Sequence, residues 1–152
     1  MFLEWHRYKV QGVNSETGRK GTVKIIARNE DAAAEELLNR DLLPPYTFQE
    51  EEFEPPTDRQ VNYAIDLGLR ISPTMNRKDV SALIDKKLDE DNDPDEDLMT
   101  FAYDKNIYFS AYIGEKSLCN LIFDTLETAD KIAFFCFAVN SQSYRDLQFH
   151  QF

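Results

Sequence analysis

The chain is poor in the residues from which most catalytic and metal sites are built. Its 152 residues include 2 histidines, 2 cysteines and 5 glycines. His6 and His150 stand at opposite ends of the sequence, outside any Cys/His cluster, so no zinc-binding spacing is present. The glycines are scattered, which excludes a phosphate-binding loop, and no serine stands in a Gly-x-Ser-x-Gly motif. The sequence therefore predicts no catalytic, cofactor-binding or metal-binding residue, and a protein that is not an enzyme.

Cysteines and long apolar runs are equally scarce. Cys119 and Cys136 both lie in apolar patterns of helical spacing, which favours two buried, reduced thiols. A disulfide between them would require an oxidising compartment. The first residues lack the basic start and apolar run of a signal peptide, and no stretch reaches the roughly 20 apolar residues of a membrane helix. We therefore expect a cytoplasmic protein that does not bind a membrane.

Negative charge is abundant but uneven. The net charge of −11 divides into +4 for residues 1–28, −8 for 29–57, +2 for 58–87 and −9 for 88–152. The molecule as a whole should repel nucleic acid at long range, whereas a basic segment can still contact an anion locally.

Residues 1–54 predict a small β-β-α-β domain. Alternation of apolar and polar residues predicts three strands, at 5–11, 22–27 and 46–49. A turn-rich loop fills residues 14–21, and an acidic, proline-ended linker follows at 49–56.

A helix is predicted between the second and third strands. Asn29 is a natural N-cap, and the acids Glu30 and Asp31 follow in the first turn, where the helix dipole favours them. Pro44-Pro45 prevents the helix from continuing. The predicted inward stripe consists of Ala33, Ala34, Leu37 and Leu38.

This first segment resembles the small N-terminal module of some bacterial secretion and regulatory proteins. The matching residues are Tyr8, Gly12, Thr17, Gly18, Gly21, Ala32, Ala33 and Ala34. The resemblance covers about a third of the chain and implies no particular function.

The first hairpin gives the one candidate binding surface. Arg7, Lys9 and Lys24 share the polar face of the two predicted strands, and Arg19 and Lys20 stand at the tip. These five residues would form a cationic patch for an anionic partner, including a nucleic acid. The alternative is a solvated strand face that balances the acidic helix at 30–36.

Residues 57–88 predict a helical hairpin. Thr57 and Gln60 form a capping box, Gly68 ends the first helix, and Asn76 with Asp79 starts the second. The predicted buried positions are Val61, Ala64, Ile65, Leu67, Val80, Leu83, Ile84 and Leu88.

Residues 57–84 are similar to a short helical-hairpin module, Thr-x-x-Gln-x-x-Tyr-Ala-x-x-Leu-Gly followed by Ser-x-Leu-Ile, appended to bacterial and phage DNA-transaction proteins. The match rests on Thr57, Gln60, Tyr63, Ala64, Leu67, Gly68, Ser81, Leu83 and Ile84. The resemblance implies a bacterial or phage origin, and the catalytic domains of those proteins are absent from this chain.

The acidic run at 89–97 opens the last segment. No register of this run satisfies an EF-hand loop, so we interpret it as a solvated loop that caps a helix, with a weak cation site as the alternative. Asp93 is the predicted N-cap, with Pro94 and Glu96 in the first turn.

Further helices are predicted after this run. The first continues into 101–108 and is broken or kinked at Gly114. A last helix at 129–141 begins after Thr128, and its apolar part, 132–139, is alternatively a buried strand. Between them lies the predicted stripe of Leu118, Leu121, Ile122 and Leu126.

The sequence thus predicts an α+β protein. Residues 1–54 form a small α+β domain, and 57–152 form a helical domain divided into a hairpin at 57–88 and a bundle at 93–145. The expected function is a non-catalytic protein-protein interaction or regulatory module. A nucleic-acid accessory role through residues 59–87 or the basic hairpin, and an acidic inhibitor or immunity-type protein, are the alternatives. The oligomeric state is left open.

Overall fold

The computed structural model describes residues 3–126 and has a mixed α+β fold. Its internal contacts divide the chain into two compact units, Met1–Phe53 and Glu54–Phe152. The division falls within the segment 49–56, which the sequence predicts as a linker. Each unit has its own apolar cluster and is described by itself.

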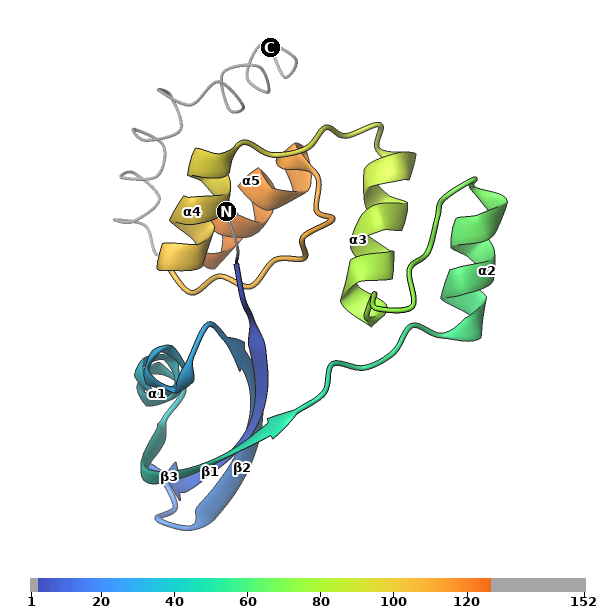
Figure 1. The fold of residues 1–152 in the computed structure, drawn as a ribbon. Coiled ribbons are helices and arrows are strands. Elements are labelled where there is room, and N and C mark those ends of the chain that lie inside the picture. Colours follow the sequence, from blue (N-terminus) through green and yellow to red (C-terminus); the bar gives the residue numbers. More distant parts are fainter. Residues whose placement is uncertain (1–2, 127–152) are drawn as a thin grey trace. The chain divides into compact units, whose positions relative to one another are not determined.

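Unit 1 contains a three-stranded antiparallel sheet and one helix (Figure 1). The sheet has the order β2-β1-β3, so β1 is central and the other two strands form the edges. The chain order is β1 (His6–Asn14), β2 (Lys20–Ala27), α1 (Glu30–Asn39) and β3 (Leu42–Glu51). The predicted β-β-α-β order of these elements agrees with the structure.

The core of unit 1 lies between α1 and one face of the sheet. Tyr8 and Val10 of β1 and Ile25 of β2 are buried there, as the alternation predicts. From α1, the buried residues are Ala32, Ala33 and Leu37. The prediction that Leu38 also faces inward was wrong, because its side chain is 52% exposed. A helix over a three-stranded sheet has one narrow contact stripe, and Leu38 falls outside it.

The third strand is longer than predicted. It begins at Leu42, contains Pro44 and Pro45, and runs to Glu51, into the segment predicted as linker. The two prolines are tolerated because β3 is an edge strand and because both lie where its register with β1 shifts, so neither is paired with a residue of β1. Contrary to our prediction, the prolines do not end α1, because the helix already ends at Asn39 and the chain turns at Asp41, which has a φ of 61°.

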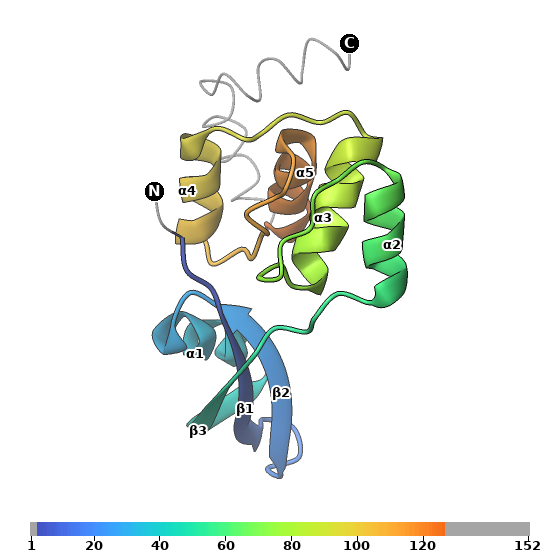
Figure 2. The ribbon, with the colours of Figure 1, turned by 45° about the vertical axis from the view of Figure 1, so that its right-hand side comes forward.

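Unit 2 is helical in its described part (Figure 2). Its helices are α2 (Asp58–Asp66), α3 (Arg77–Leu88), α4 (Glu96–Asp104) and α5 (Glu115–Thr125). Within residues 3–126, no helix is both long enough and apolar enough to cross a membrane.

The ends of the first two helices agree with the sequence prediction. Thr57 with Gln60, and Asn76 with Asp79, form reciprocal capping boxes at α2 and α3. Gly68 follows α2 with a φ of 81°, a left-handed conformation that costs glycine little. These signals depend on neighbours within four residues, which is why the sequence alone predicts them.

The buried faces of these helices were predicted less well. Ala64, Val80 and Ile84 form the apolar cluster between α2 and α3. Ile65 and Leu88, which we predicted to be buried, are 57% and 52% exposed. Each helix contributes one or two buried residues, and partly buried residues, mostly from the loop between the helices, complete the contact: Leu67, Leu69, Ile71 and Met75.

The third segment corrects two predictions. The N-cap of α4 is Asp95 rather than Asp93, and its carboxylate accepts a hydrogen bond from the Leu98 N–H at 2.8 Å. The helix ends at Asp104, within the predicted range 101–108, and Asn106, two residues further on, adopts a φ of 56°. Gly114 does not interrupt this helix; it is the N-cap residue of α5.

In α5, Leu118 and Ile122 are buried and Leu121 is half-buried, as is Leu126, the C-cap residue that follows the helix. The predictions for Thr128, residues 129–141 and the alternative strand at 132–139 lie outside the described residues, as do Cys136 and His150.

Candidate functional site

The face of the sheet opposite α1 carries most of the predicted basic patch. Because side chains alternate along a strand, the burial of Tyr8 and Val10 places Arg7 and Lys9 on this other face. The paired residues across it form three rows, Ile26–Arg7–Glu51, Lys24–Lys9–Gln49 and Thr22–Gln11–Thr47. We call the residues of these rows the outer face.

Two lysines stand directly opposite each other in the middle row. Lys9 and Lys24 are cross-strand partners, and both side chains are exposed. The Lys24 Nζ lies 3.7 Å from a Glu51 carboxylate oxygen. Like charges placed opposite each other destabilise an antiparallel pair, so this row works against the stability of the sheet.

The remaining two residues of the predicted basic patch, Arg19 and Lys20, lie at the tip of the hairpin. Asn14 Oδ1 accepts hydrogen bonds from the N–H groups of Glu16 and Thr17 at 2.9 and 3.1 Å, which closes the turn. Arg19 is exposed in this turn. Lys20 begins β2, and the alternation along the strand puts it on the same face as Lys24.

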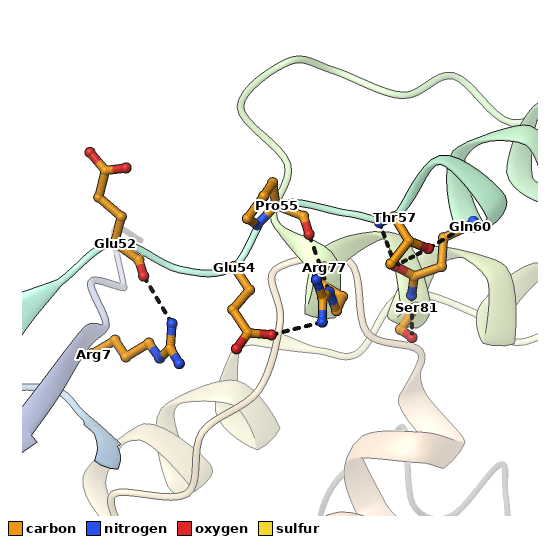
Figure 3. A network of polar contacts seen from close by, with 8 residues as sticks. All are labelled: Arg7, Glu52, Glu54, Pro55, Thr57, Gln60, Arg77 and Ser81. Carbon is orange, nitrogen blue, oxygen red and sulfur yellow. Dashed lines mark hydrogen bonds and ion pairs between the residues drawn. The ribbon is translucent and has the colours of Figure 1, made fainter.

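Arg7 differs from the other basic residues. Its guanidinium donates a hydrogen bond to the Glu52 carbonyl oxygen at 3.1 Å (Figure 3), and Glu51 is its Cα partner on β3. Arg7 therefore holds the end of β3 against β1. The structure brings Lys9, Lys20 and Lys24 together on one face, with Arg19 at the tip and Arg7 turned toward β3.

On the opposite side of β1, His6 lies beside two carboxylates. His6 lies on the side of β1 that carries Tyr8, and its side chain is 25% exposed. Its Nδ1 is 2.5 Å from Glu50 Oε1, and its Nε2 is 3.6 Å from Glu4 Oε1. His6 is thus a half-buried histidine with carboxylate neighbours, which fits the structural role that its place on the apolar strand face indicates.

Three of the six basic residues of 59–87, which the nucleic-acid alternative would use, make contacts within unit 2. Arg77 pairs with Glu54 at 2.9 Å and donates to the Pro55 carbonyl oxygen at 3.2 Å (Figure 3). Lys86 pairs with Asp93, and the Lys78 Nζ lies 5.4 Å from the Tyr108 ring centroid. Because of these contacts, fewer basic side chains of residues 59–87 are available to a nucleic acid than their number in the sequence implies.

The acidic run holds unit 2 together. Asp91 supplies the cap that the N-terminus of α5 lacks locally, because its carboxylate accepts from the N–H groups of Lys116 at 3.0 Å and Ser117 at 3.3 Å. The Asn92 carbonyl oxygen accepts from the Glu115 N–H at 2.8 Å. Sequence reasoning missed this role, since the cap comes from 25 residues away. A helix start without its own cap residue, at Gly114, was the available signal.

A hydrogen-bond network joins α3 to the loop before α5. The Ser110 hydroxyl donates to Asp79 Oδ1 at 2.6 Å, and Asp79 Oδ2 accepts from the Asn76 N–H at 3.1 Å. Burial raises the pKa of the nearby Tyr108 to about 12, and the charge of Asp79 acts in the same direction. This phenol stays protonated at neutral pH.

Cys119 is buried in α5 as a free thiol. Burial, reinforced by the charges of Glu115, Asp95 and Asp91, raises its pKa to about 12. Because the thiolate is the reactive form, this side chain is a poor nucleophile at neutral pH. In residues 3–126, no group of three or more His, Cys, Asp and Glu side chains is arranged to hold a metal ion.

Comparison with protein-family models, with curated proteins and with solved structures finds no match to this chain.

Proposed function

We propose that this protein is a non-catalytic interaction module that binds an acidic segment of another protein through the outer face of its sheet. The observation that carries the proposal is the cross-strand pair of Lys9 and Lys24. Like charges opposite each other disfavour strand pairing, and the Lys24–Glu51 ion pair offsets part of this repulsion. An acidic ligand would relieve that repulsion, so the pair contributes to binding rather than to the stability of the free protein.

The charge of the whole chain bears on the choice of partner. A net charge of −11 repels a polyanion such as DNA at long range, whereas a short segment with a few carboxylates suffers less repulsion. Acids on β3, including Glu51 beside Lys24, also limit the length of the basic surface. Both features favour a protein segment over nucleic acid.

The remaining parts of the proposal follow from the chemistry of the chain. Cys119 stays a protonated thiol at neutral pH, in keeping with a role without nucleophilic catalysis. The cytoplasmic location expected from the sequence is part of the proposal. The acids Asp91 and Asp95 cap helices and Asp93 pairs with Lys86, so the run offers fewer free carboxylates to an inhibitor of the DNA-mimic type. A bacterial or phage origin rests on the resemblance of residues 57–84.

The substitution Lys9→Glu tests this proposal because it separates stability from binding. Opposite Lys24, a glutamate forms a favourable pair, so the free energy of unfolding should rise by roughly 0.2–1 kcal/mol. Capture of the protein partner should fall. Urea unfolding gives the first quantity; quantitative mass spectrometry of nuclease-treated cytoplasmic extract captured on the immobilised protein gives the second.

Lys116→Glu is the matched control, since it makes the same change of charge at an exposed lysine of α5. It should retain the partner. The proposal would be contradicted by a partner that the Lys9→Glu variant still captures, or by a partner whose capture is lost when nuclease is present.

A further inference from the structure

We propose that the outer edge of β2 accepts the acidic segment as a fourth, extended strand. This inference rests on the proposed function and adds the manner of binding. A strand at the end of a sheet presents unpaired backbone donors and acceptors, and an extended peptide can complete them. In this sheet β2 and β3 are the two strands with such an edge.

The two edges differ in their fitness for this role. β3 contains Pro44 and Pro45, which lack N–H donors, and its register with β1 shifts between Gln11 and Val13. β2 is 8 residues long, contains no proline and pairs with β1 in one unbroken register from Lys20 to Ala27. Only β2 offers a regular row of backbone groups along its whole length.

The side chains of β2 indicate the sequence of the added strand. Lys20, Thr22 and Lys24 project on the outer face, while Val23 and Ile25 project toward the core under α1. A neighbouring strand places its own residues beside these two rows in alternation. The matching segment therefore alternates acidic residues, next to the lysines, with β-branched apolar residues, next to Val23.

The same features disfavour other occupants. A second copy of β2 would bring its own lysines against Lys20 and Lys24, and lysine on an edge strand is a known device against such self-pairing. A nucleic acid has no alternating N–H and C=O groups with which to extend the backbone ladder. The acidic peptide strand is the occupant that satisfies both the charge and the backbone.

The test uses the full-length protein and a labelled peptide of alternating Glu and Val, with binding measured by fluorescence anisotropy. One comparison peptide has the same composition with Glu and Val in separate blocks. Two others carry N-methyl groups on alternate backbone amides, one in each of the two registers. Only every second amide of an added strand faces β2, so N-methylation should matter in one register only.

We expect the block peptide and one of the two N-methylated peptides to bind at least tenfold more weakly than the parent peptide. Hydrogen exchange, followed by NMR, should slow at alternate amides of β2 when the parent binds. Lys24→Glu should weaken binding at least tenfold, and Lys116→Glu should not.

Several results would overturn the inference. If both N-methylated peptides bind like the parent and no β2 amide is protected, the outer face binds side chains alone, and the proposed function stands without the strand. If the peptide does not bind but the native partner is still captured through Lys9, the added strand is again excluded and the proposed function stands. Failure of both experiments removes the proposed function as well. A dimer formed at rising protein concentration, or equal binding of a single-stranded oligonucleotide, would identify a different occupant.

Discussion

Gly114 leaves room for a helix cap that a residue distant in the sequence supplies. It is the N-cap residue of α5 but has no side chain to accept the helix N–H groups. A Cβ added at this position would lie 2.5 Å from Cγ and 2.7 Å from Cβ of Asp91, closer than packed atoms allow. The glycine therefore leaves the space through which the Asp91 carboxylate reaches Lys116 and Ser117.

We predict that Gly114→Ala destabilises the protein by roughly 1–2 kcal/mol, because Asp91 must move and its cap is lost. Gly21→Ala is the control, since its Cβ would meet the nearest atom, Leu42 Cδ1, at an ordinary 3.5 Å. That variant should change the free energy of unfolding by about 1 kcal/mol or less. Urea unfolding of the two variants measures both. Equal losses would show that Gly114 has no special spatial role.

At the scale of an element, α1 illustrates what local pattern can and cannot predict. Asn29 accepts the Ala32 N–H at 2.8 Å, as the sequence indicates, because a cap involves only near neighbours. The width of the buried stripe depends on the sheet beneath the helix. Leu37 is fully buried and its neighbour Leu38 is half exposed, although both fit the apolar periodicity.

Adjacent alanine substitutions test this assignment of the helix face. Leu37→Ala should lower the free energy of unfolding by about 2–5 kcal/mol, because it removes a buried side chain from the core of unit 1. Leu38→Ala should change it by about 0.5 kcal/mol or less. Thermal or urea unfolding distinguishes them. Similar losses from the two would mean that the helix faces the sheet in a different rotation.

At the scale of the whole molecule, each of the two units has an apolar cluster of its own within residues 3–126. The cluster of unit 1 lies between α1 and the sheet, and one cluster of unit 2 lies between α2 and α3. Unit 2 also contains Cys119 and Tyr108, whose pKa values are raised to about 12 by burial. Because of these raised pKa values, the free energy of unfolding depends on pH in the alkaline range.

We predict that the free energy of unfolding falls as pH rises from 9 to 12. The unfolded chain releases the Cys119 proton near its ordinary pKa of 9.0 and the Tyr108 proton near 10.0, whereas the folded chain keeps both up to about 12. The unfolded state then binds fewer protons, so the slope of stability against pH is negative. Urea midpoints across this range measure the effect. Cys119→Ala should remove the part of the loss that begins near pH 9; an unchanged profile would contradict the prediction.

The candidate site was predictable in its residues but not in its arrangement. Strand alternation places Lys9 and Lys24 on one polar face without knowledge of the fold. Their direct opposition depends on the register of β1 with β2, and the engagement of Arg7 by Glu52 depends on β3 lying beside β1. Register is set by long-range pairing, which the residues of one strand do not specify.

The sequence by itself determined the features that arise from close neighbours: the caps at Asn29, Thr57 and Asn76, the glycine stop at Gly68, and the order of strands and helix in unit 1. The tertiary structure alone decided which apolar residues stay exposed and that Asp91 caps a distant helix. It also decided that β2, free of proline, lies at an edge of the sheet. The reason is physical: a helix cap or a turn forms between residues a few positions apart, whereas burial and strand pairing depend on segments that meet only after the chain has folded.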